Sequence, residues 1–155
     1  SWIGAFLGIF AVGFLGHLVQ FEQQDILFLI GSFGALAVLL YGTPGVPLAQ
    51  PRNLMGGHIL SALTGVLMYG WIADPLYLSG ALSVATAIAV MHLTKTTHPP
   101  GGATALIAVI GSERVHQLGF LYVLSPVALG ALIMLLVSLI VNNLISFRRY
   151  PVFWW

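Results

Sequence analysis

The sequence has no cysteine and very little charge. Without Cys among its 155 residues, disulfides, thiolate catalysis and cysteine-ligated metal or iron–sulfur sites are excluded. Charged side chains make up 6% of the chain, against about 25% in an ordinary soluble domain. This excludes a soluble globular protein, because so few charges cannot cover the surface that a small domain leaves in water. It also excludes disorder, which needs high charge and low hydrophobicity.

What the sequence does have is apolar length. Hydrophobic residues make up 59% of the chain, and the mean hydropathy is +1.00. A helix needs about 20 mostly apolar residues to cross about 30 Å of hydrocarbon. We therefore predict one all-α domain over residues 1–155, a polytopic transmembrane helical bundle in a lipid bilayer. The apolar spans cover residues 1–19, 26–41, 54–72, 76–93 and 118–145, the last with a kink at Pro126.

Residues 94–113 do not fit a simple span. Their apolar run, 103–111, is too short to cross the membrane as a helix, and two prolines in the stretch 96–102 interrupt helix. The segment either dips in and returns, giving five crossings, or crosses as an extended stretch followed by a half-helix that starts near Gly102. About seven extended residues and nine helical ones together rise far enough to cross.

Positive charge favours the second topology. Cytoplasmic loops collect Lys and Arg, and Arg52, Lys95, Arg148 and Arg149 share one side only if residues 94–113 cross. The prediction is then six crossings with the N-terminus inside. Glu22, Asp25 and Asp74 are then expected in outer loops, so that no buried acid is available to relay protons. Arg114 also falls outside, next to Glu113.

Six crossings divide into a 3+3 inverted repeat with the Pro-Gly broken segment fifth. Residues 31–39 and 102–110 both combine small residues, a hydroxyl and an apolar run, with Ser32 and Thr104 as the hydroxyls. The alternative is that membrane helices are simply rich in Gly, Ala and Leu. If the repeat is real, these two segments meet near the membrane centre.

Several motifs resemble those of the HPP family of integral membrane proteins. The signature is His98-Pro99-Pro100 followed by residues 101–106, with residues 31–42, 47–53 and 56–62 upstream. The family is usually described with four spans, against the six read here. Similar members in cyanobacteria and chloroplasts are associated with nitrite transport. The resemblance implies a nitrite transporter, with a bacterial plasma membrane favoured and a chloroplast membrane as the alternative.

The residues also predict an anion site without the family. A half-helix starting near Gly102 leaves its first N–H groups without partners and carries about +0.5 of a charge at its start. Gly101 and Gly102 let a ligand approach the backbone, and Thr104 adds a donor. The alternative is a structural Pro-Gly turn. The predicted substrate-binding residues are His98, Pro99, Gly101, Gly102, Ala103, Thr104, Ser32, Gly34, His58 and Asn53.

Some of these residues have a second interpretation. His98 either hydrogen-bonds an anion or caps nearby carbonyls, and His58 is either a functional intramembrane group or an interhelical contact. Asn53 also looks like a helix N-cap. Arg52 and Lys95 are either an anion-attracting vestibule or cytoplasmic anchors.

The sequence therefore predicts membrane transport of a small inorganic anion, nitrite above all. The alternatives are a passive anion channel and an assembly or sensor subunit without transport. We expect no enzymatic activity, no cofactor or metal and no nucleic-acid partner. We expect a homo-oligomer, with close helix contacts or oligomer faces at Gly8, Gly13, Gly16, Gly57 and Gly65.

Overall fold

A computed structural model gives the fold of residues 1–155, and it describes all of them except residues 19, 21 and 145. The described part is helical and contains no strand. Its elements are α1 (Trp2–Leu18), α2 (Gln23–Ala37), η1 (Val38–Gly42), η2 (Pro47–Ala49), α3 (Pro51–Trp71), α4 (Leu76–Leu93), α5 (Pro99–Ile110), α6 (Glu113–Leu118), η3 (Val123–Ala128) and α7 (Leu129–Asn143).

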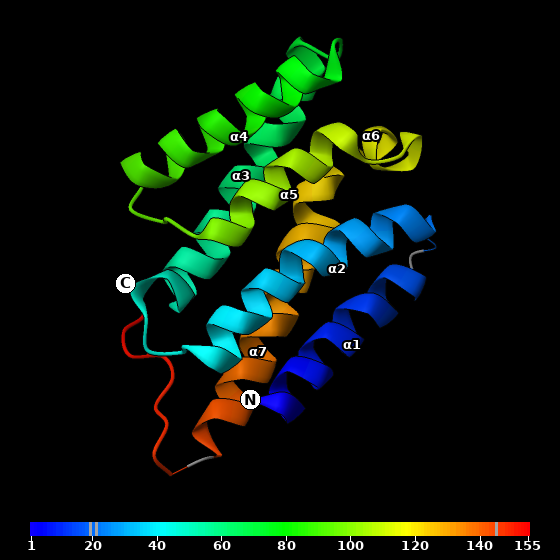
Figure 1. The fold of residues 1–155 in the computed structure, drawn as a ribbon. Coiled ribbons are helices and arrows are strands. Elements are labelled where there is room, and N and C mark those ends of the chain that lie inside the picture. Colours follow the sequence, from blue (N-terminus) through cyan, green and yellow to red (C-terminus); the bar gives the residue numbers. More distant parts are fainter. Residues whose placement is uncertain (19, 21, 145) are drawn as a thin grey trace.

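The long segments run in alternating directions, with α5 across the middle of the bundle (Figure 1). On one side α5 packs on α3 and α4, and on the other it packs on α2. Helix α1 closes the far side against α2 and α7. Helix α5, which comes from the irregular segment 94–113, therefore lies at the centre of the bundle.

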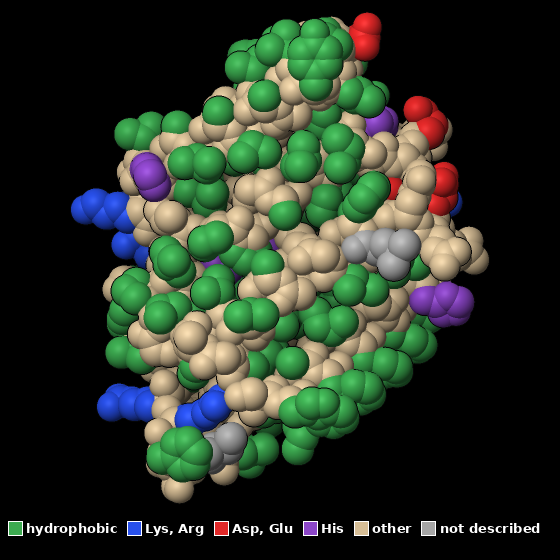
Figure 2. Space-filling model, in the orientation of Figure 1, with side chains coloured by type: hydrophobic (Ala, Val, Ile, Leu, Met, Phe, Trp, Pro, Cys, Tyr) green, Lys and Arg blue, Asp and Glu red, His purple; other side chains and the backbone are tan. Residues whose placement is uncertain are grey.

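Hydrogen bonds identify which loops share an end of the bundle. At one end Arg148 donates to the Tyr41 carbonyl (3.0 Å) and to Ser1 Oγ (2.9 Å), and Arg52 donates to the Thr94 carbonyl (2.8 Å). In Figure 2, Lys and Arg gather mainly along one side and Asp and Glu at the opposite corner. This segregation is the one that the loop charges predicted.

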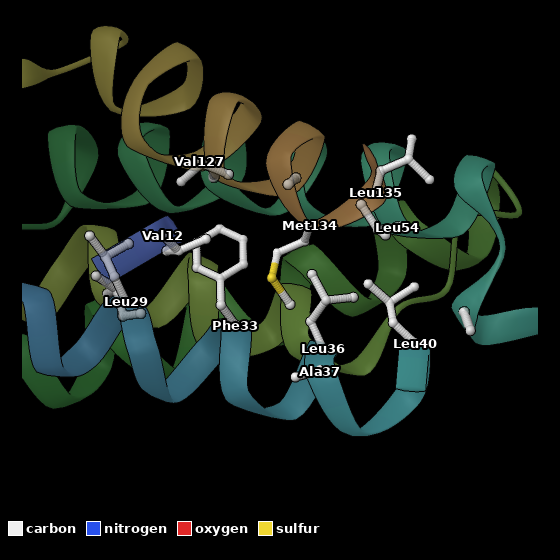
Figure 3. Packing of buried hydrophobic residues seen from close by; sticks show 14 of the residues in the cluster. Val12, Leu29, Phe33, Leu36, Ala37, Leu40, Leu54, Val127, Met134 and Leu135 are labelled. Atoms are coloured by element: carbon white, nitrogen blue, oxygen red, sulfur yellow. The ribbon is translucent and has the colours of Figure 1, made fainter. Parts of the chain in front are cut away.

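The core lies where α2 meets α7 (Figure 3). Phe33 and Leu36 of α2 point toward Met134 of α7, and all three side chains are almost completely buried. The two helices can approach closely here because Gly130 has no side chain. A Cβ at this position would lie 2.7 Å from the Phe33 ring.

Glycines that were predicted to mark close helix contacts or oligomer faces lie against other helices of the same chain. A Cβ at Gly8 would lie 2.7 Å from Met134 Sδ, and one at Gly16 would lie 3.2 Å from the Ile26 side chain. Gly13 faces Ile30 at an ordinary 3.6 Å. Of the two interpretations, close contact between helices of one chain is the one that the structure supports at these positions.

Three helical segments of the described residues are long and apolar enough to cross a membrane: Gln23–Gly42, Leu76–Leu93 and Val123–Asn143. Trp2–Leu18 and Pro99–Ile110 are apolar but shorter. The count of six crossings stays a prediction. The predicted starts at 26, 54 and 118 are wrong, since these helices begin at Gln23, Pro51 and Val123. The predicted ends at 19 and 145 lie outside the described residues.

The last span is interrupted as predicted from Pro126. Ser125 has extended dihedral angles (φ −139°, ψ 123°) inside η3, because the residue before a proline avoids the helical region. Before it, Gly119 turns the chain out of α6 at φ +50°, a conformation that suits glycine. The predicted span from 118 therefore includes only the last residue of α6, and the apolar span itself, formed by η3 and α7, begins after the Gly119 turn.

Candidate functional site

Polar side chains from three helices meet at the centre of the bundle. Ser32 Oγ of α2 lies 2.9 Å from Thr104 Oγ1 of α5, and His58 Nδ1 of α3 lies 2.8 Å from the same Thr104 oxygen. Ser32 also donates to the Pro100 carbonyl (3.0 Å). All three side chains are at most 2% exposed. The sequence named each of them separately, and the fold brings them into one network.

His98 adjoins this network from the segment between α4 and α5. Its Nδ1 lies 2.8 Å from the Leu48 carbonyl, and its ring meets the His58 ring edge-on with 4.9 Å between centroids. The Phe33 ring stacks on the His58 ring, with 5.1 Å between centroids. We call Ser32, His58, Ser61, His98 and Thr104 the central cluster.

Glycines allow the chain to approach this closely. A Cβ at Gly57 would overlap His98 Cβ and lie 3.0 Å from the Thr96 carbonyl. A Cβ at Gly101 would lie 2.8 Å from both the Gly57 carbonyl and Ser61 Oγ. These glycines therefore seat α5 and His98 directly on α3, and Gly101 faces protein rather than open space.

Three polar atoms of the central cluster have no hydrogen-bond partner among the described residues. They are His58 Nε2, His98 Nε2 and Ser61 Oγ, and each residue is 0% exposed. Leaving such a group unpaired costs about 1–3 kcal/mol. Within the described part of the chain, no three His, Cys, Asp or Glu side chains gather as a metal would require. A small polar ligand would fit these atoms better than a metal ion.

A pocket of about 490 Å³ lies beside the cluster, between α4 and α5. Its lining is mostly apolar and includes Met91, Pro99, Gly102 and Ala103, with His98 at its edge. Three of the predicted binding residues therefore line this pocket rather than the hydrogen-bonded network. His98 lines the pocket and also contacts the network through the His58 ring.

The start of the half-helix differs from the prediction. Helix α5 begins at Pro99, with His98 as its N-cap, because proline is well suited to the first turn of a helix. Pro99 and Pro100 have no N–H, and the Gly101 N–H donates to the His98 carbonyl (2.9 Å). The predicted helix start near Gly102 is therefore wrong, and of the first three residues of α5 only Gly101 has an N–H group.

The remaining predicted residues lie around the cluster. Asn53 donates to the Thr97 carbonyl (2.8 Å) and steadies the chain before His98. It is not an N-cap, since α3 begins at Pro51 with Gln50 in the capping position. Gly34 lines a different pocket beside α1. Lys95 is exposed at the positively charged end.

One acidic residue is placed differently from the prediction. Asp25 lies in the first turn of α2 and is 0% exposed. Its carboxylate accepts hydrogen bonds from the Ser112 N–H (2.9 Å) and the Ser112 hydroxyl. The prediction that Asp25 lies in a loop is therefore wrong, and so is the statement that no acid is buried. Its partner lies 87 positions away, beyond the reach of local sequence patterns.

Sequence reasoning also missed Ser61 and Tyr122. Ser61 follows His58 by three positions on α3, so the two share a helix face, and this spacing could have found it. Tyr122 donates to the Thr104 carbonyl (3.0 Å) from the turn before η3, and no local spacing pointed to it. Both residues are fully buried.

Comparison with known proteins finds one family and two curated relatives. The profile of the HPP transmembrane region matches residues 1–151. A transmembrane protein of Dictyostelium discoideum is 49% identical over all of this chain and 50% of its own length. A second from the same organism is 42% identical over all of this chain and 55% of its own. The chain thus spans about half the length of these relatives. No solved structure matches.

Proposed function

The chain belongs to the HPP family of transmembrane proteins, and we propose that this integral membrane protein transports a small inorganic anion through its central cluster. Nitrite is the favoured substrate, because the sequence resembles members associated with nitrite transport. The names of the Dictyostelium relatives say only that they are transmembrane proteins, so they leave the substrate open.

One observation carries this proposal: His58 Nε2, His98 Nε2 and Ser61 Oγ, all in the central cluster, are buried without partners among the described residues. Polar groups that serve only the fold are normally paired when they are buried. Unpaired polar groups on neighbouring residues beside a break in a membrane segment are typical of a binding site. A triatomic anion is small enough to bond more than one of them.

Charge at one end of the bundle supports the entry of an anion. Arg52 donates to the Thr94 carbonyl, four residues before His98, and Lys95 lies exposed beside it. In our proposal these two cations form a vestibule that raises the local concentration of anions. The cluster itself lies deeper and binds through neutral groups, which favours release.

We further propose six crossings arranged as an approximate 3+3 inverted repeat. Exchanging α1, α2 and α3 with α4, α5 and α7 pairs the α1–α2 contact with α4–α5, and the α3–α4 contact with α7–α1. The contact between α2 and α5 maps onto itself. The relation is approximate, since α3 packs on α5 far more extensively than α7 packs on α2. Our proposed setting is a homo-oligomer in a bacterial plasma membrane, with a chloroplast membrane as the alternative.

The test is anion uptake into liposomes that carry the purified protein, comparing nitrite, nitrate, chloride and formate. The informative variant is Ser61→Ala. Because Ser61 Oγ has no partner among the described residues, its removal should not destabilise the fold. If this hydroxyl contacts the anion, uptake falls at least fivefold while thermal stability is unchanged or higher.

Ser79→Ala is the matched control. Ser79 Oγ is equally buried and also without a described partner, but it lies near the start of α4, away from the cluster. This variant should keep full uptake. If no anion enters above the level of empty liposomes, with the protein folded and inserted, the proposal is wrong. Equal loss in both variants would remove the central cluster from the pathway.

A further inference from the structure

The hydrogen bond of His98 fixes which ring nitrogen carries its proton. The Leu48 carbonyl, 2.8 Å from His98 Nδ1, can only accept a hydrogen bond. His98 Nδ1 must therefore be the N–H donor. In the neutral ring Nε2 is then a bare acceptor, and this is the nitrogen that has no partner among the described residues.

Ser61 differs from His98 in this respect, and the role of His58 depends on its tautomer. Ser61 has a hydroxyl hydrogen to donate. Thr104 has one hydroxyl hydrogen and lies near His58 Nδ1 (2.8 Å), Ser32 Oγ (2.9 Å) and the Pro100 carbonyl (3.3 Å). When that hydrogen goes to His58 Nδ1, His58 Nε2 is an N–H donor. When Ser32 donates to the Pro100 carbonyl and Thr104 donates to Ser32, His58 Nδ1 is the donor and His58 Nε2 is an acceptor. In both arrangements Ser61 can donate and His98 Nε2 is an acceptor.

This set of atoms does not suit a bare anion. The Ser61 hydroxyl attracts its oxygens, but the lone pair of His98 Nε2 repels them. Resting on the proposed function, we propose that the central cluster binds its anion together with one proton, which lies between the anion and His98 Nε2. The substrate class is thus a weak oxyacid in net neutral form, such as nitrous acid or nitrite plus a proton.

The proton balance is simple. A neutral acid enters and its O–H donates to His98 Nε2, or an anion enters beside a ring that has gained a proton at Nε2. The two descriptions contain the same atoms and differ only in the position of one hydrogen. On release the anion and the proton leave to the same side, no covalent bond other than that to the proton changes, and His98 returns to its neutral form.

The groups around His98 leave this proton without a fixed counter-charge. From α3 the titratable group that faces it is His58, and from residues 43–50 its contact is the Leu48 carbonyl. From α4, the apolar side chain of Met91 lines the adjoining pocket. Nearby charged or titratable side chains hold other positions: Arg52 bonds the Thr94 carbonyl, Lys95 and His92 are exposed, and Tyr150 bonds the Ala49 carbonyl.

The first test measures charge and proton movement by the wild-type protein in liposomes, with empty liposomes subtracted at every condition. An inward proton gradient of one pH unit should drive nitrite to about tenfold accumulation. A potassium–valinomycin potential, negative inside, should leave that accumulation unchanged. A bare monovalent anion would respond oppositely, changing about tenfold for each 59 mV and ignoring the pH gradient.

Two variants separate hydrogen bonding from proton transfer. His98→Asn places an amide N–H where Nδ1 was and keeps the Leu48 bond, whereas His98→Gln reaches the position of Nε2 with an amide that cannot take a proton. Both should lose accumulation driven by the pH gradient, and any remaining uptake should follow the potential. In detergent, nitrite binding by the wild type should take up about one proton from weak buffer, and binding by either variant none.

The outcomes separate the two proposals. Uptake that follows the potential and ignores the pH gradient overturns proton coupling and leaves anion transport standing. Absence of uptake for every anion overturns the transport function itself. Proton-coupled uptake that survives in His98→Gln overturns the role of His98. Absence of proton uptake on binding by the wild type shows that the cluster binds the bare anion or only water, which also overturns the inference.

Discussion

Gly101 and Gly102 are neighbours in the first turns of α5 but have opposite surroundings. A Cβ at Gly101 would lie 2.8 Å from the Gly57 carbonyl oxygen and 3.2 Å from its carbon, both backbone atoms of α3. A Cβ at Gly102 would lie 3.9 Å from Val84 Cγ1, an ordinary contact. The same substitution, Gly→Ala, should therefore have opposite effects at these two positions.

The magnitudes follow from two opposing terms. Replacing Gly by Ala within a helix stabilises it by up to about 1 kcal/mol, and this gain applies to both variants. Overpacking costs about 1–3 kcal/mol, and the upper value applies to Gly101 because backbone atoms cannot rotate away. Gly101→Ala should be destabilised by about 2 kcal/mol and Gly102→Ala stabilised by up to about 1 kcal/mol, a difference of about 3 kcal/mol.

Both variants can be compared with the wild type by reversible unfolding in mixed micelles, followed by the circular dichroism of the helices. Anion uptake adds a second readout. Gly101→Ala shifts α5 and His98 away from α3, so its uptake should fall. Gly102→Ala adds a methyl group to the edge of the pocket and should keep most of its uptake.

Equal changes in the two unfolding free energies would refute the placement of Gly101 against the Gly57 carbonyl. A stable Gly102→Ala variant without uptake would refute a different part of the reasoning. It would mean that the anion approaches the α5 backbone at Gly102, as the sequence alone suggested.

Two further predictions concern the ends of the bundle. Asp25→Asn should cost about 2 kcal/mol of unfolding free energy, since the hydrogen bonds from Ser112 to a charged carboxylate contribute about 1.5–3 kcal/mol. The control is Glu22→Gln at an exposed position nearby, which should change the unfolding free energy by less than about 0.5 kcal/mol. Equal effects of the two substitutions would contradict the buried bond. Burial raises the pKa of Tyr150 from 10.0 to about 12, so the stability that its bond to the Ala49 carbonyl (2.7 Å) contributes is complete below pH 10 and is lost as the pH rises to 12. Tyr150→Phe should lack this alkaline loss, and a phenolate absorbance that titrates near pH 10 in the folded protein would count against the prediction.

Loop charges and prolines could be interpreted from the sequence because their effects are local. Arg52 and Lys95 mark one end of the bundle through the bias of membrane insertion, and Pro126 breaks the last span wherever it is placed. Helix starts were less accurate. Pro99 was taken as an interruption before a helix, but it occupies the first turn of one, where its missing N–H costs nothing. The third helix likewise begins earlier than predicted, with Pro51 in its first turn.

The central cluster was predicted in part. Ser32, His58, His98 and Thr104 stood out because polar side chains are scarce in apolar spans, and the fold places all four together. Free amides at Gly102 were expected instead of side-chain atoms, since the sequence does not show that His98 caps α5. Gly34 was also predicted to bind the substrate, but it lines a different pocket, beside α1.

The sequence by itself determined the membrane environment, the helical class and the polar residues that stand out in apolar spans, because these follow from composition and from short-range backbone chemistry. Only the tertiary structure decided that Leu48 binds His98, 50 positions away, and that Ser112 binds Asp25, 87 positions away. Those contacts settle which nitrogen of His98 is free and which acid is buried. They depend on how α2, α3 and α5 pack at their glycines, and packing over such separations leaves no periodic trace in the chain.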